Sequence, residues 1–395
     1  MAIVGLSFAA LGQRVAHAGS ADVYVTHVFG PRWGFVAGWV LLLSYLMFTA
    51  GVTAIVGNFV AAALLQAGIH IQQEWLAICL VCALIAIWFV WYDMRIAARL
   101  MLALEGISVL TILFLAARIL TKVPLSTIPF RPDPSHGWSG IGYGLVFAVL
   151  AFAGFEGAAA IGAETRNARR IIPLAIIVTV VIAGLFYLIV SYAEVMGYGL
   201  DRVQMLAQAD APLDTLSAKF VSAKFAIFID VAAALSAFAA AIGSLSAASR
   251  MMYAVGRSGL VPKLGELHPK HGTPGVAALV VGGLNIAGLL LWGARYGVES
   301  YSGSVLAIGT LSLVLIYLAI TMAAMVEAVR NRRVARSLLG LLGGVLLLWP
   351  LWNSVYPVPS WPSNLWPYFV VSWLVAGTVL AFLRPAAELV PSAAD

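Results

Sequence analysis

The sequence predicts an all-α polytopic membrane protein, and three observations support this fold class. Of the 395 residues, 62% are hydrophobic and only 10% are charged, whereas soluble domains carry about 25% charged residues. Ten apolar runs are long enough to cross a bilayer, which takes about 20 residues each. Sixteen of the 23 Lys and Arg residues lie in alternate loops on one side of the predicted bundle. Because basic loops stay cytoplasmic, that side is the inner one.

The ten runs follow one another without an intervening soluble domain. They lie near residues 35–64, 74–92, 100–120, 139–165, 172–197, 224–249, 274–293, 303–327, 336–356 and 364–383. A shorter apolar piece from Ala2 to Leu11 rises about 15 Å, roughly half of the hydrocarbon core. The largest outer loop is 198–223, where 200–208 and 212–220 are each expected to form a short surface helix.

The run 139–165 has a charged residue at its centre. Residues 152–157 read Phe-Ala-Gly-Phe-Glu-Gly, so two glycines bracket Glu156. A carboxylate at that depth is costly and usually functional. Glycine permits non-helical backbone, and a broken helix in a membrane lines a cavity or is buried in protein. Because secondary transporters build substrate sites from such breaks, this segment is the predicted site. The alternative is that Gly154 and Gly157 are close-packing positions between helices.

Three acids inside predicted spans are candidates for coupling transport to a proton or sodium ion: Glu156, Glu105 and Asp230. Glu156 is either a proton carrier or a structural group that ties the broken helix to its neighbours through hydrogen bonds. Glu105 and Asp230 either face the bundle interior as relay members or lie near the interface, paired with a loop arginine.

Several other functions are disfavoured. The sequence has no G-x-x-x-x-G-K-[ST] loop for an ATP-driven pump. It also has no H-E-x-x-H, G-x-S-x-G or D-D-x-x-D pattern, so it is not expected to be an enzyme.

Cys79 and Cys82 lie in an apolar run with no third ligand near, so no metal or cofactor is expected. The net charge is +6, but the basic residues lie mainly in the loops on one side of the predicted membrane bundle. Nucleic acid is therefore not an expected partner. The basic cluster at 330–336 is interpreted as a topology signal, with contact to anionic lipids as a weaker addition.

Separate motifs along nearly the whole chain are shared with a known family. They lie at residues 6–14, 18–19, 24–25, 29–39, 152–156, 164–173, 247–254, 259–262 and 307–311. In that order they resemble helices 2 and 3, helix 6 with the loop after it, the end of helix 8, and helix 10 of amino acid permeases. These permeases belong to the amino acid–polyamine–organocation superfamily.

The resemblance implies a leucine-transporter-type inverted-repeat fold, with helices 1–5 set against helices 6–10. On that map, residues 1–120 are the remainder of the first repeat, with half of helix 2 and helices 3–5. Residues 139–327 are the second repeat, and residues 336–383 are helices 11 and 12 of the same membrane domain. The first helix and part of the second are expected to be missing from this sequence, which leaves ten full transmembrane helices and a half helix.

The resemblance also implies a site and a function. On this resemblance, the carbonyl groups around Phe152, Ala153 and Phe155 would take the ammonium of the substrate, Gly154 would permit the unwinding, and Glu156 would belong to the same site. The carboxylate of the substrate would meet helix 1, so that half of the site is expected to be missing from this sequence. The implied activity is secondary active transport of amino acids across the cytoplasmic membrane by alternating access, with ion coupling or exchange. The expected partners are an amino acid and the lipid bilayer. The alternative is a transport-inactive fragment or regulatory membrane subunit that lacks a complete substrate site.

Overall fold

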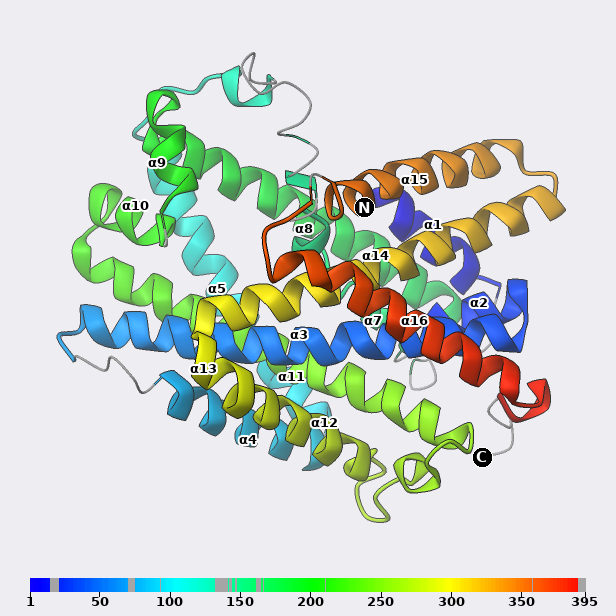
Figure 1. The fold of residues 1–395 in the computed structure, drawn as a ribbon. Helices are drawn as coiled ribbons and strands as arrows, with labels where there is room; N and C mark the ends of the chain where they lie inside the picture. The colour runs from blue at the N-terminus through cyan, green and yellow to red at the C-terminus, as the bar shows by residue number, and fades with distance from the viewer. Residues whose placement is uncertain are drawn as a thin grey trace.

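The computed structural model of the chain is a bundle of long α-helices (Figure 1). It describes residues 1–14, 21–69, 75–92, 94–131, 141, 144–145, 148–160, 165, 167–209, 211–356 and 358–389. The α-helices are α1 (Ala2–Gly12), α2 (Ala21–Phe29), α3 (Pro31–Gln66), α4 (Trp75–Tyr92), α5 (Met94–Leu120), α7 (Gly157–Ala160), α8 (Ala168–Tyr198), α9 (Val203–Ala207), α10 (Pro212–Phe220), α11 (Ala223–Arg257), α12 (Gly275–Gly288), α13 (Ala294–Tyr296), α14 (Val298–Arg330), α15 (Val334–Asn353) and α16 (Trp366–Leu383).

Within these described ranges, nine helical segments are long and apolar enough to cross a membrane. They confirm nine of the ten predicted runs. One of them, Gly275–Tyr296, joins α12 and α13 through a π-helical turn at Leu289–Gly293. The remaining run, 139–165, is interrupted, and its residues 139–140, 142–143, 146–147 and 161–164 lie outside the described part of the chain. The division of the chain into two repeats stays a prediction.

Helix α3 is the central element of the bundle. It runs across the molecule in Figure 1, with α4 and α11 packed on one side and α14 on the other. Its sequence explains this position, because Leu41, Leu43 and Ala54 are buried around the helix instead of forming one apolar stripe. A helix that is apolar all round is a buried helix. Gly30, with a φ of +92°, and Pro31 in the first turn set where α3 begins.

Helix α2 lies directly against the first turns of α3. The contact requires Gly34, because a Cβ there would overlap the Thr26 hydroxyl and the Asp22 carbonyl oxygen. Gly38, one turn later, would place its Cβ 3.3 Å from the Cβ of Asp22. The glycines thus allow the short helix α2 to pack closely against the central helix.

The outermost helices leave large apolar side chains exposed. On α8 these include Leu174, Ile182 and Leu185, and on α15 they include Leu338 and Leu342. Patches of this size on a soluble protein mark contact surfaces, and on spanning helices they face lipid. The outer connection contains two short helices, α9 and α10, which confirms the prediction for 200–208 and 212–220.

Candidate functional site

The chain leaves helical geometry at residues 152–156, between a helical stretch at 148–151 and α7. Gly154 has a φ of +109°, a conformation that other residues rarely adopt. The amide groups of Phe152 and Gly157 donate to the carbonyl oxygens of Val149 and Gly154, at 3.2 and 3.0 Å. These bonds span three residues instead of the four of an α-helix. The break therefore lies where the two glycines predict it.

The Glu156 carboxylate points into the protein, and its side chain is 2% exposed. Its Oε2 accepts hydrogen bonds from the Tyr317 hydroxyl at 2.7 Å and from the Gly154 amide at 3.0 Å. Its Oε1 accepts a hydrogen bond from the Tyr45 hydroxyl at 3.2 Å. Tyr45 belongs to α3 and Tyr317 to α14, so one carboxylate links the break to both helices.

Aromatic rings enclose the break on two sides. The Phe155 ring stacks on Tyr317 with centroids 5.4 Å apart and meets the edge of Phe8 of α1 at 5.7 Å. The Phe152 ring packs edge-on against Tyr187 of α8 at 5.3 Å. The Tyr187 hydroxyl donates to the Ala151 carbonyl oxygen. Helices α1, α8 and α14 therefore pack against both sides of the break. Each aromatic pair contributes about 0.5–1.5 kcal/mol to stability, in addition to the contribution from its buried apolar area.

Two carbonyl oxygens of the unwound backbone have no hydrogen-bond donor in the part of the chain that the structure describes. Among the described residues, no amide or side chain donates to the carbonyl oxygens of Phe152 and Ala153. The Phe155 carbonyl oxygen accepts a long bond, 3.4 Å, from the Ala158 amide. An unpaired backbone carbonyl removed from water costs about 1–3 kcal/mol. The break thus presents oxygen atoms that are able to accept hydrogen bonds from a ligand.

Glu105 does not join Glu156. It lies on α5 with an exposed side chain, and its Oε2 accepts a hydrogen bond from the Ser236 hydroxyl of α11 at 2.7 Å. The structure therefore places this acid at the contact between α5 and α11, with a hydroxyl partner instead of an arginine.

Asp230 forms a separate polar cluster near the start of α11. The Gln66 side-chain amide donates to Oδ2 of Asp230 and to Oδ2 of Asp214, each at 2.8 Å. Asp230 is 2% exposed, and Asp214 belongs to the short helix α10. Burial raises the pKa of Asp214. This cluster joins the ends of α3, α10 and α11, and it does not contain Glu156 or Glu105.

Sequence reasoning missed the two tyrosines that bind Glu156. Tyr45 and Tyr317 each lie in the middle of an apolar run, and a buried tyrosine hydroxyl usually has a hydrogen-bond partner. That rule was the available signal, but it does not identify the partner. The described residues contain no group of three or more His, Cys, Asp or Glu side chains arranged to hold a metal ion. The buried Cys79 thiol instead contacts the Ala54 carbonyl oxygen of α3 at 3.7 Å.

A multi-pass helical membrane protein with an interrupted core helix is the class that this fold and site define. The fold is similar to that of MhsT in its crystal structure in complex with L-phenylalanine, with a TM-score of 0.54 and 14% identity. The match covers 97% of this chain and 88% of that chain. It shows a leucine-transporter-type fold, as the resemblance implied. A family profile described as amino acid permease matches residues 1–391. The chain therefore belongs to the amino acid permease family.

Curated relatives agree with this family. The low-affinity putrescine importer PlaP of Escherichia coli is 24% identical over 71% of this chain and 62% of its own length. The branched-chain amino acid permease BcaP of Lactococcus lactis is 28% identical over 71% of this chain and 64% of its own length. An uncharacterised transporter of Mycobacterium tuberculosis is 29% identical over 88% of this chain and 74% of its own length. The chain thus spans less than two thirds of the length of the first two.

Proposed function

We propose that this chain acts in secondary active transport of amino acids across the cytoplasmic membrane by alternating access. The observation that carries the proposal is the pair of carbonyl groups, on Phe152 and Ala153, that accept no hydrogen bond from any described residue. An ammonium group that leaves water needs oxygen acceptors of this kind. Broken helices in secondary transporters supply them from the backbone.

An amino acid is our proposed substrate class, and a diamine is the runner-up. BcaP is named for branched-chain amino acids and PlaP for putrescine. Both kinds of molecule carry an ammonium group, which the two carbonyl groups suit. The surroundings favour the amino acid, because Phe152 and Phe155 place apolar rings beside the break. A diamine needs a second anionic partner for its second ammonium, and the Glu156 carboxylate already accepts three hydrogen bonds.

We propose a proton as the coupling ion, carried by Glu156. The ionised carboxylate accepts bonds from two tyrosine hydroxyls and one backbone amide. A protonated carboxyl becomes a donor at one oxygen, so it no longer accepts from all three groups. Protonation would therefore reverse the direction of one tyrosine bond, since a hydroxyl can rotate and accept, and so change the link from the break to α3 or α14. The structural interpretation of Glu156, in which the bonds only hold the helices together, is the alternative. Glu105 and Asp230 remain candidates for further proton-carrying steps.

The test is uptake into liposomes that contain the purified chain. Labelled isoleucine, phenylalanine and putrescine are supplied separately, against protein-free liposomes as the control. We expect saturable uptake of an amino acid that excess unlabelled compound blocks. We also expect stimulation by an inward proton gradient, and loss of that stimulation when an uncoupler is added.

Three outcomes contradict parts of the proposal. Uptake of putrescine alone would show that the substrate is a diamine and not an amino acid. Stimulation by a sodium gradient and not by a proton gradient would show that the coupling ion is sodium and not a proton. No uptake of any compound above the protein-free control would favour the transport-inactive or regulatory alternative.

A further inference from the structure

A small cavity lies where α1, α14 and α15 meet, at the inner side of the bundle as the loop charges define it. Its charged lining consists of Arg14, Arg333, Arg336 and Glu327. Small apolar residues, among them Ala324 of α14, line the rest of the cavity. The guanidinium groups come from the turn after α1, from the turn after α14 and from the first turn of α15. Residues far apart in sequence thus converge on one cavity.

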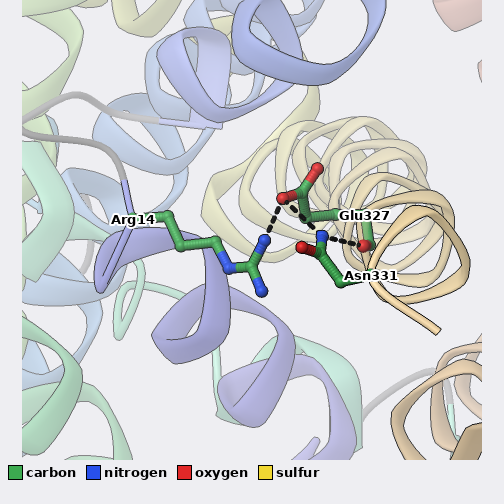
Figure 2. Close-up of polar contacts among 3 residues, drawn as sticks. All are labelled: Arg14, Glu327 and Asn331. Carbon is green, nitrogen blue, oxygen red and sulfur yellow. Dashed lines mark hydrogen bonds and ion pairs between the residues drawn. The ribbon is translucent and has the colours of Figure 1, made fainter. Parts of the chain in front are cut away.

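The one carboxylate in the cavity is already engaged. Glu327 forms an ion pair with the Arg14 guanidinium (Figure 2). Its Oε1 also accepts a hydrogen bond from the Asn331 side-chain amide at 3.0 Å, and that amide donates as well to the Glu327 backbone carbonyl oxygen (Figure 2). These contacts hold Arg14 and Glu327 at one wall of the cavity and leave the two other arginines outside the pair.

Arg333 and Arg336 carry the unbalanced charge. Within the described part of the chain, neither guanidinium has an ion pair or a side-chain hydrogen bond, and both residues are exposed. Three arginines against one glutamate give the lining a net charge of +2. Arginine stays charged at any physiological pH, and its planar fork matches the oxygen atoms of a phosphate group.

The surroundings point to a lipid as the source of that phosphate. Helix α15 begins at Val334 with these arginines, and the leucines that follow, Leu338, Leu341 and Leu342, are 60%, 54% and 49% exposed. Charged groups at the end of a spanning helix lie at headgroup depth, and the exposed leucines lie in the hydrocarbon. Basic pockets between helices on the cytoplasmic side suit anionic headgroups.

We propose that this cavity binds the phosphate of an anionic glycerophospholipid from the inner leaflet. Arg333 and Arg336 contact the phosphate, Arg14 and Glu327 form the fixed wall, and the acyl chains follow the exposed leucines of α15. A topology signal alone requires basic residues in the loop. It does not require a third arginine, Arg14 in the turn after α1, to line the same cavity and to be held there by an ion pair.

The experiment is native mass spectrometry of the full chain, extracted from vesicles with equal amounts of phosphatidylglycerol and phosphatidylcholine. We expect the wild-type chain to retain phosphatidylglycerol in preference to phosphatidylcholine. The double variant Arg333→Gln/Arg336→Gln should lower that preference roughly thirtyfold. Each arginine near an anionic lipid raises the affinity about fivefold, and the two factors multiply. The matched control, Lys263→Gln/Lys270→Gln, removes the same charge from the same side of the bundle and should keep the preference.

A second variant separates lipid binding from damage to the fold. Glu327→Gln removes the competing carboxylate and should preserve or raise retention of phosphatidylglycerol, whereas misfolding would lower it. Equal retention of both lipids by the wild-type chain would overturn the proposal. So would an equal loss of preference in the lysine control. A third contrary result is thermal stabilisation by inorganic phosphate without stabilisation by phosphatidylglycerol, because the ligand would then be a free anion.

Discussion

The Tyr317 hydroxyl donates a hydrogen bond of 2.7 Å to Oε2 of Glu156 and thereby joins α14 to the broken helix. The same oxygen accepts from the Gly154 amide, two residues away along the break. A hydroxyl can rotate and become an acceptor, but a backbone amide cannot. The protonation state of Glu156 therefore sets the direction of its hydrogen bonds with the tyrosines. The bond from the Gly154 amide cannot reverse, so this amide needs an acceptor oxygen in either state.

Replacement of Glu156 by glutamine tests the coupling role. The glutamine oxygen can accept from Gly154 and Tyr317, while its NH₂ group faces Tyr45, whose hydroxyl can accept. We therefore expect Glu156→Gln to fold, and its uptake to lose the dependence on a proton gradient. Proteoliposome uptake with and without the gradient measures this, with circular dichroism to check the fold. Gradient-dependent uptake equal to that of the wild type would leave Glu156 with the structural role only.

The two tyrosines form a matched pair of variants. Tyr317→Phe removes a short bond to the carboxylate, and hydrogen bonds to charged groups contribute about 1.5–3 kcal/mol. Tyr45→Phe removes the longer bond of 3.2 Å, for which we expect about 1 kcal/mol. Thermal unfolding in detergent should rank Tyr317→Phe as the less stable variant. The reverse order would mean that the Tyr45 bond is the main support of the carboxylate.

Gly154 and Gly157 provide a second matched pair. A Cβ on either glycine would meet no atom of a described residue within 4 Å, but of the two only Gly154 has a positive φ. Gly154→Ala should therefore cost about 1–2 kcal/mol through backbone strain alone. Gly157→Ala, in the first turn of α7, should stabilise the protein by up to about 1 kcal/mol. Thermal unfolding of both variants checks the difference. Equal effects would show that the unusual conformation of Gly154 is not required.

The composition and the glycines allowed much of the fold to be predicted. In the part of the chain that the structure describes, nine spans and the two outer helices follow from apolar runs and the turn residues between them. The break at Gly154 follows from a local rule about glycine beside a buried charge. These features depend on residues close together in sequence, which is why one sequence is enough to predict them.

The partners of the acids did not follow from the sequence. Glu156 binds Tyr45 and Tyr317, which are 111 and 161 residues away. Gln66 binds Asp230 across 164 residues. Such pairs depend on the rotation and depth of each helix in the bundle, and periodicity within a single helix does not fix either. For Asp230, the observed partner is an amide shared with a second carboxylate and not a loop arginine, while the relay role stays a prediction.

Asp22 on α2 should make stability depend on pH. Its Oδ1 is buried and, within the described residues, accepts no hydrogen bond. Burial raises the pKa of this carboxyl to about 6, although backbone hydrogen bonds from Val23 and from Asp22 itself act in the opposite direction. In the unfolded chain its pKa is about 4. The folded protein therefore loses stability as pH rises from about 4 to about 6, and the loss approaches about 3 kcal/mol above that range.

The variant Asp22→Asn should remove this loss. We expect it to unfold at a higher temperature than the wild type at pH values well above 6, and at nearly the same temperature at about pH 3, where Asp22 of the wild type is largely protonated in both the folded and the unfolded state. Asp201→Asn is the control, because the Asp201 side chain is 81% exposed and lies beside Arg202. It should show no such pH-dependent gain. A gain for Asp22→Asn that is the same at both pH values would mean that packing against Gly38, and not the buried charge, limits the stability of α2.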